Sequence, residues 1–147
     1  MHTSIKIPCT LIPTNNVNLI LPNSAIEEVI VSDAIKPLPH TPSWITGSIC
    51  WHNQNINIVT FDQPHVTDET NRSGKHIIVV VRNPSADNNR AFFGILAKNM
   101  PQVIEANTQN IDRNLRPENT HTHAKSYVYI NGKDAIIPDI DLLNREA

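Results

Sequence analysis

The residues with the most obvious chemical potential are the histidines, of which the chain has seven. His121 and His123 are separated by one residue, so an extended backbone would place both imidazoles on the same face. That spacing can hold a transition metal, with His65 or His76 as a further ligand. Both histidines, however, lie in a polar stretch without a cysteine or carboxylate pattern. A loop is the simpler interpretation, and we predict no metal ligand and no cofactor.

Cys50 with His40 or His52 is a second candidate, as a nucleophilic pair of a hydrolase. A thiol becomes reactive when a neighbour lowers its pKa, whereas an apolar environment raises the pKa. Cys50 lies in an apolar run, which predicts a small, buried hydrophobic side chain. The glycine motifs that bind phosphate or dinucleotides, the serine hydrolase motif and the zinc-finger spacing are all absent from the sequence. We therefore predict no catalytic residue and no enzyme.

Composition and charge exclude several other classes of protein. The 12 basic and 14 acidic residues nearly balance, and no dense basic cluster with aromatics is present, so nucleic acid is not an expected partner. No run approaches the roughly 20 apolar residues that span a bilayer, and residues 1–10 lack the apolar stretch of a signal peptide. We expect a cytoplasmic protein without direct membrane insertion, in which Cys9 and Cys50 are free thiols.

Short strands joined by turns are the elements that must position these residues. Richness in isoleucine and valine, together with eleven prolines and four glycines, favours strands over a helix bundle. Polar stretches over 62–75, 83–90 and 107–125 predict connections, the last with Ile111 and Leu115 on one helical turn. An early proline and an acidic first turn predict a short helix over 138–146. The predicted strands cover residues 17–21, 26–31, 49–51, 56–61, 76–81, 91–97, 126–130 and 134–137.

Three of these segments carry more specific information. Asn131-Gly132 is a strong hairpin signal between the last two predicted strands. Residues 53–55 are polar and turn-prone, which predicts a second hairpin. The run over 77–81 is continuously apolar and predicts a strand buried on both faces, as a strand shared by two lobes would be.

A stiff connector precedes the hairpin predicted at residues 53–55. Pro37, Pro39 and Pro42 fix φ and remove backbone donors, which excludes them from a helix and from a central strand. Trp44 follows, with enough apolar area to anchor a core, and Gly47 permits a close backbone approach that a side chain would block. We therefore predict that this segment is a rigid, core-anchored connection that leads directly into the next strand.

Taken in order, these pieces resemble the CheW-like domain of bacterial chemotaxis adaptors. The resemblance covers roughly the whole chain, and its specificity comes from the order of the pieces, since each one alone is a weak signal. The matching segments are Glu27-Glu28-Val29, Ile35-Lys36-Pro37-Leu38-Pro39, Pro42-Ser43-Trp44-Ile45-Thr46-Gly47, Ile56-Asn57-Ile58-Val59, Ala91-Phe92-Phe93-Gly94-Ile95-Leu96 and Ile136-Ile137-Pro138-Asp139-Ile140-Asp141-Leu142-Leu143.

The resemblance implies an all-β fold in which two five-stranded, SH3-like barrels share a core and a short C-terminal helix follows. Residues 1–147 would form a single domain, with the central part of 17–70 in the first barrel and 76–147 plus an N-terminal strand in the second. The implied function is that of a non-catalytic adaptor. It would couple the cytoplasmic tip of a chemoreceptor to the regulatory domain of a CheA-type histidine kinase.

The resemblance also implies which residues bind partners. Trp51 fits two interpretations from the sequence, a core residue or a partly exposed contact. Cys50, His52 and Asn53 replace the usual Asn, Arg and Gly of the family, and this pattern is closer to the pilus-associated PilI and ChpC type, which implies control of twitching by type IV pili. The partner-binding residues implied are Ile26, Glu28, Gly47, Trp51, His52, Met100 and Val103.

Two interpretations of a different class stay open beside this one. Glu27 and Glu28 also fit solvent-facing residues at a bend or an edge strand, without any partner. The number of histidines is also compatible with a β-barrel that binds a metal or a small ligand.

Overall fold

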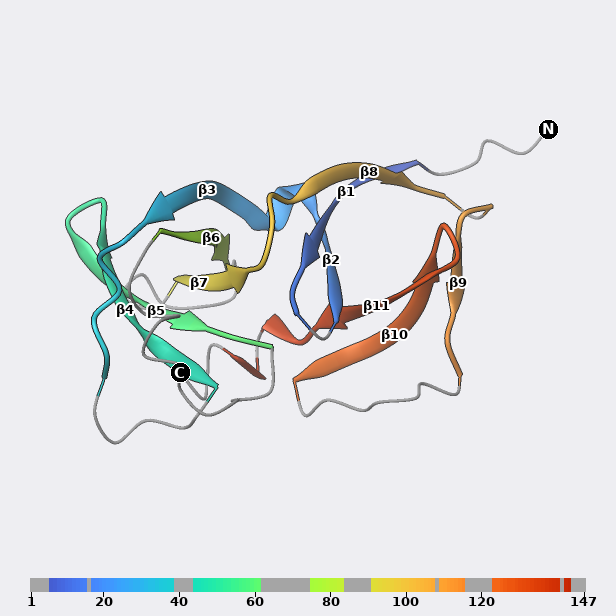
Figure 1. Cartoon of the computed structure of the whole chain (residues 1–147). Helices are drawn as coiled ribbons and strands as arrows, with labels where there is room; N and C mark the ends of the chain where they lie inside the picture. Colours follow the sequence, from blue (N-terminus) through green and yellow to red (C-terminus); the bar gives the residue numbers. More distant parts are fainter. Residues whose placement is uncertain are drawn as a thin grey trace.

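The computed structural model describes residues 6–15, 17–38, 44–61, 75–83, 91–107, 109–115, 123–140 and 142–143. These residues form two lobes built almost entirely of strands (Figure 1). The all-β, two-lobed prediction is confirmed. The strands are β1 Ile7–Pro13, β2 Asn18–Pro22, β3 Ile26–Ser32, β4 Ile45–Trp51, β5 Gln54–Val59, β6 His76–Arg82, β7 Phe92–Ala97, β8 Gln102–Ala106, β9 Ile111–Arg113, β10 Ala124–Ile130 and β11 Lys133–Pro138.

Each lobe is one sheet with its own strand order. The first has five strands in the order β3-β6-β7-β5-β4, and the second has six in the order β8-β1-β2-β11-β10-β9. The division of the chain differs from the one expected. Strand β2 pairs with β1 in the second lobe, whereas β6 and β7 join β3 and β5 in the first. The first lobe is therefore built from one continuous stretch of strands, β3 to β7, and the second combines the strands before and after that stretch. The two lobes lie side by side (Figure 1).

Buried apolar residues form three clusters in series, one inside each lobe and one between the lobes. Inside the first lobe lie Ile49, Trp51, Ile56, Ile58, Ile78 and Val80. Inside the second lie Cys9, Leu11, Ile20, Ala106, Val128, Ile130 and Ala135. The shared core contains Ile12, Leu19, Leu21, Val59, Phe61, Val79, Val81, Phe93, Ile95, Ala97, Ile136 and Leu143, which come from both sheets.

Strand β6 shows how alternation builds this arrangement. Ile78 and Val80 enter the first-lobe cluster, whereas Val79 and Val81 enter the shared core. Successive side chains of a strand point to opposite faces, so only a continuously apolar strand can serve two cores. The prediction that this strand is buried on both faces is confirmed.

Both predicted hairpins are present, each with a two-residue turn. Asn131 and Gly132 have φ of 51° and 77°, and His52 and Asn53 have φ of 48° and 62°. Positive φ at both central residues is typical of the type I′ turn, whose twist matches that of the flanking strands. The first hairpin turns at residues 52–53 instead of 53–55, because Trp51 pairs directly with Gln54. His52 consequently projects from the end of the hairpin.

The first barrel closes through an isolated bridge between Lys36 and Ser48. Each residue's amide nitrogen donates to the other's carbonyl oxygen at 2.8 Å. Gly47, next to the bridge, is buried. A Cβ there would lie 2.3 Å from the Lys36 carbonyl oxygen and 2.8 Å from Cγ2 of Ile35. The close approach expected at Gly47 is confirmed.

Several elements differ from the sequence-based expectation. The local pattern did not predict strands β1, β8 and β9, although the resemblance implied an N-terminal strand in the second barrel; β9 lies inside the stretch expected to be a connection. Ile111 is in that strand and Leu115 is 83% exposed, so the helical turn proposed for the two is wrong. A strand of three residues is too short to show an alternating pattern, which is why β9 left no signal.

The predicted terminal helix is not supported. Pro138 ends β11, where it pairs with Ala124. Residues 140, 142 and 143 form a helical turn, in which the carboxylate of Asp139 accepts a hydrogen bond from the amide of Leu142 at 3.1 Å. The sequence suggested that Pro138 begins a helix. A proline also fits the end of a strand, because its lack of an N–H donor costs no hydrogen bond of the sheet there.

Cys50 is exposed, which corrects the expectation of a buried side chain. It alternates along β4 with the inward-facing Ile49 and Trp51, so its own side chain points to solvent. Cys9 is buried, and that burial raises the pKa of its thiol, while a hydrogen bond with the backbone of Ala106 lowers the pKa by less. The two cysteines are unpaired in the structure, as expected.

This difference predicts the thiol chemistry. A disulfide reagent near pH 8 is expected to modify one thiol per folded chain quickly, because the thiolate is the reactive form and Cys50 alone is accessible. The raised pKa of Cys9 means that its contribution to stability is full below the unfolded-state pKa and is lost as pH rises through the folded-state value. The fast phase should vanish in Cys50→Ser and persist in Cys9→Ser, and the reverse result would contradict the assignment.

Candidate partner-binding surfaces

A bulge in β3 separates Ile26 from Glu28, two of the residues expected to bind partners. Ile26 pairs with Val81 and Glu28 with Val80, so the register shifts by one between them. Val81 faces the shared core and Val80 the first-lobe cluster. Ile26 therefore packs at the shared core, while Glu28 turns to the opposite face of the sheet. The two therefore cannot form one contact that combines a charge with an apolar anchor.

Glu28 belongs to a small polar group at the open end of the first lobe, here called the Glu28 cluster, with Trp51 and His52. The indole Nε1 of Trp51 donates to Glu28 Oε2 at 3.2 Å, and Nε2 of His52 lies 3.5 Å from the same oxygen. The Glu28 and His52 side chains are 41% and 65% exposed. The cluster thus presents an oriented carboxylate and an imidazole to solvent.

Trp51 supports this cluster from below. Its side chain is only 8% exposed, and its ring centroid lies 4.9 Å from that of Phe92 and 4.3 Å from that of His52. Of the two interpretations left open by the sequence, the structure favours the core residue. A rigid donor beneath Glu28 holds the carboxylate in one orientation, which is how a buried side chain can shape a surface.

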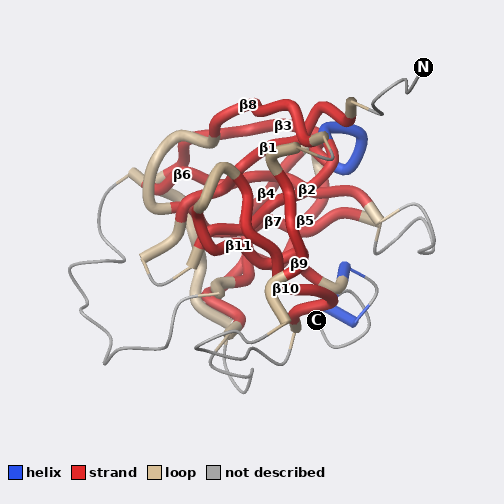
Figure 2. The backbone as a smooth tube through the Cα atoms, turned by 90° about the vertical axis from the view of Figure 1, so that its right-hand side faces the viewer, coloured by secondary structure: helices blue, strands red, loops and turns tan. Residues whose placement is uncertain are grey.

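Exposed apolar residues gather where the two lobes meet. Strands β3 and β8 are edge strands; they follow one another along the same edge of the molecule, β3 over the first lobe and β8 over the second (Figure 1), and overlap in the perpendicular view (Figure 2). On β3, Val29 and Val31 are 36% and 56% exposed, and on β8 Val103 is 72% exposed. Met100, in the connection between β7 and β8, is 59% exposed.

Register places these valines on the faces that the two sheets turn toward each other. Val29 pairs with Val79 of the shared core. Val103 pairs with Thr10, which pairs in turn with Leu21 of the same core. Directly paired residues lie on the same side of a sheet. We call the resulting strip, which consists of Ile26, Val29, Val31, Met100 and Val103, the interlobe margin.

The predicted site residues therefore divide into three groups. Ile26, Met100 and Val103 lie on the interlobe margin, and Glu28 and His52 are in the Glu28 cluster. Trp51 and Gly47 are buried and act on the surface only through their neighbours. Sequence reasoning missed Val29 and Val31, although their alternation with Glu28 and Ile30 was a signal that one face of this strand stays apolar and outward.

Comparison with known proteins agrees with this architecture. The family model of the CheW-like domain matches residues 9–147. The chain belongs to the CheW-like domain family. Family members are non-catalytic scaffolds, so membership supports an adaptor role in chemotaxis and is consistent with the prediction that the chain is not an enzyme.

A solved structure shows the same fold for this CheW-like chain. It is similar to the crystal structure of the scaffolding protein TtCheW from Thermoanaerobacter tengcongensis, with a TM-score of 0.67 and 15% sequence identity. The match covers 91% of this chain and 89% of that one. No curated protein sequence matches it.

The remaining chemical candidates gain no support from the described residues. Among them, no group of three or more His, Cys, Asp or Glu side chains could hold a metal ion. His123 is buried, with its ring centroid 4.5 Å from that of Trp44, so it packs between the lobes. His40, His65 and His121 lie outside the described residues. No helix in the described part is long and apolar enough to cross a membrane.

Proposed function

We propose that this protein is a cytoplasmic adaptor that couples the tip of a chemoreceptor to the regulatory domain of a CheA-type histidine kinase. The observation that carries the proposal is the interlobe margin, where edge strands of both lobes expose apolar side chains on their facing sides. An apolar strip of this kind suits the apolar stripe of a helical receptor tip, because buried apolar anchors supply most of the affinity of an interface.

The Glu28 cluster is proposed as the kinase-docking surface. A carboxylate held by Trp51 presents a fixed negative charge, and His52 adds a positive charge only when it is protonated. Charged groups at the rim of an interface mainly determine encounter rate and partner choice. His52 would therefore select a kinase that differs from the partner of an adaptor with arginine at this position.

A change on the interlobe margin is expected to weaken binding of the receptor tip. Val103→Asp should lower the affinity for a purified receptor cytoplasmic fragment at least about tenfold, because a carboxylate would be buried against an apolar helix face. Calorimetry or surface plasmon resonance measures the change. Leu115→Asp is the matched control. Leu115 is 83% exposed and lies two residues after the end of β9, away from the interlobe margin. Equal loss in both variants, or no loss in Val103→Asp, would contradict the receptor site.

A change in the Glu28 cluster should act on the other partner. His52→Glu would put a second carboxylate in place of an imidazole whose Nε2 lies 3.5 Å from Glu28 Oε2, and neighbouring like charges repel. We expect about tenfold weaker binding of the kinase regulatory domain and unchanged binding of the receptor fragment. Asn55→Glu makes the same charge change at an exposed site outside the cluster. Kinase binding that His52→Glu leaves intact would count against this surface.

The pilus assignment rests on the sequence pattern Trp51-His52-Asn53 alone. We propose that the pathway controls twitching by type IV pili, in the manner of the PilI and ChpC adaptors that this pattern resembles. Deletion of the gene is expected to abolish directed twitching and to leave swimming chemotaxis intact. Loss of swimming chemotaxis alone would contradict the assignment while leaving the adaptor role standing.

A further inference from the structure

The second lobe carries a polar row that neither proposed surface uses. Tyr129, near the end of β10, pairs directly with Asp112 on β9 and with Asp134 on β11. Directly paired side chains share one face, with Cβ atoms about 5 Å apart, so two carboxylates flank one aromatic ring. The neighbouring row on that face contains Tyr127 and Ile136, which pack at the shared core. The Tyr129 row is thus the first row beyond the core.

All three side chains of this row are open to solvent. Tyr129 is 39% exposed, and both aspartates are exposed. Within the described part of the chain, neither aspartate side chain makes an ion pair or a hydrogen bond, and the only bond nearby is from the Asn18 amide to the Asp134 backbone oxygen at 3.3 Å. Among the described residues, no neighbour on this face balances the two negative charges.

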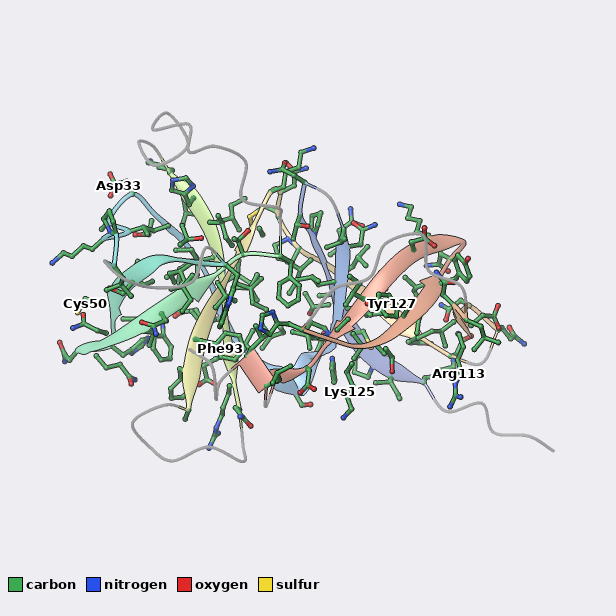
Figure 3. The ribbon with its side chains drawn as sticks, turned by 90° about the horizontal axis from the view of Figure 1, so that it is seen from below. Asp33, Cys50, Phe93, Arg113, Lys125 and Tyr127 are labelled. Atoms are coloured by element: carbon green, nitrogen blue, oxygen red, sulfur yellow. The ribbon has the colours of Figure 1, made fainter. Side chains whose placement is uncertain are left out.

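The basic side chains described near this row, Arg113, Lys133 and Lys125, start from other positions. Arg113 pairs with Val128 and Lys133 with Ile130, and both partners face the interior of the lobe. These two basic residues thus start from the face opposite to the row. Lys125 is four residues from Tyr129, about 13 Å along the strand. Figure 3 shows Arg113 toward the outer end of this lobe, far from Cys50 at the other end of the molecule.

We infer that the row formed by Asp112, Tyr129 and Asp134 binds an arginine side chain presented by a protein partner. A guanidinium is planar and stacks on an aromatic ring, and it donates in several directions within its plane. The carboxylates lie on either side of the ring, with the outer strands about 10 Å apart, so a guanidinium over Tyr129 can reach both. Lysine would offer a point charge without the stacking. This surface is separate from the Glu28 cluster and the interlobe margin.

The probe is a blocked tripeptide, acetyl-Gly-Arg-Gly-amide, titrated to about 20 mM into the uniformly 15N-labelled full chain, since a single exposed contact is expected to bind in the millimolar range. The amides of residues 112, 129 and 134 should shift in a saturable manner. The matched peptide with citrulline, which has the same shape without the charge, should bind at least about fivefold more weakly. Higher salt should weaken the arginine peptide only.

Variants then assign the contact to the row. Tyr129→Leu and the pair Asp112→Asn with Asp134→Asn should each weaken the arginine peptide about threefold or more, whereas Asp33→Asn, on an exposed carboxylate of the first lobe, should not. The conservative Asn variants keep the row testable even if the tyrosine variant does not fold. Absence of shifts, equal binding of citrulline, or binding that these variants leave unchanged would each overturn the inference, and none of these results bears on kinase or receptor binding.

Discussion

Gly47→Ala is expected to lower the free energy of unfolding by about 3 kcal/mol or more. A Cβ at 2.3 Å from the Lys36 carbonyl oxygen cannot be accommodated unless the backbone segments separate. Separation breaks the two 2.8 Å bonds of the Lys36–Ser48 bridge, each worth about 1 kcal/mol, and adds the strain of an overpacked site. Urea denaturation followed by circular dichroism measures the difference.

Two other glycines provide the controls for this prediction. Gly132 has no heavy atom within 4 Å of an added Cβ, and its φ of 77° is a conformation that asparagine tolerates. Gly132→Asn should cost under about 1 kcal/mol. At Gly94 the atoms closest to an added Cβ are side-chain atoms of Ile58 and Ile78, at 2.5 and 2.6 Å, and the nearest backbone atom is at 3.9 Å, so the cost of Gly94→Ala should fall between the other two. A Gly47→Ala protein as stable as Gly132→Asn would show that the bridge does not close the barrel.

Trp51→Ala is expected to cost about 3 to 5 kcal/mol, the usual range for removing a buried aromatic ring. The ring is part of the first-lobe cluster and contacts Phe92, so its removal leaves a cavity in that cluster. The same change frees Glu28 from its indole donor. Stability and kinase binding should therefore fall together, and thermal unfolding combined with a binding assay measures both.

Trp51→Phe distinguishes the two contributions. Phenylalanine keeps most of the ring packing but has no N–H, so Glu28 loses its bond while the cavity stays small. We expect a stability loss of about 1 kcal/mol, because Glu28 is 41% exposed and water can replace the donor. Kinase binding should still weaken severalfold, since the carboxylate is no longer oriented. If binding in Trp51→Phe equals that of the unchanged protein, Trp51 has only a packing role.

The fold was accessible from sequence wherever the local pattern was strong. The alternation before Phe61, the unbroken apolar run over 77–81 and the Asn131-Gly132 turn each specify one backbone solution, and all three are present. Strands β1, β8 and β9 gave weaker patterns. Strand β1 is buried on both faces in its middle and has prolines near both ends, so its sequence shows no alternation of polar and apolar residues. Strand β8 exposes three of its five residues. Their pairing depends on distant strands, which local patterns do not reveal.

The candidate surfaces divide along the same line. Composition and spacing by themselves determined a chain rich in strands and a glycine at a close approach. The resemblance to the CheW-like domain added residues 26, 28, 52, 100 and 103 as candidates for binding. Only the tertiary structure decided that Ile26 and Glu28 face opposite ways, that Trp51 is buried and Cys50 exposed, and that Val29 and Val31 extend the apolar strip. The physical reason is that one bulge exchanges the two faces of a strand. Which face becomes surface depends on strands that are distant in sequence.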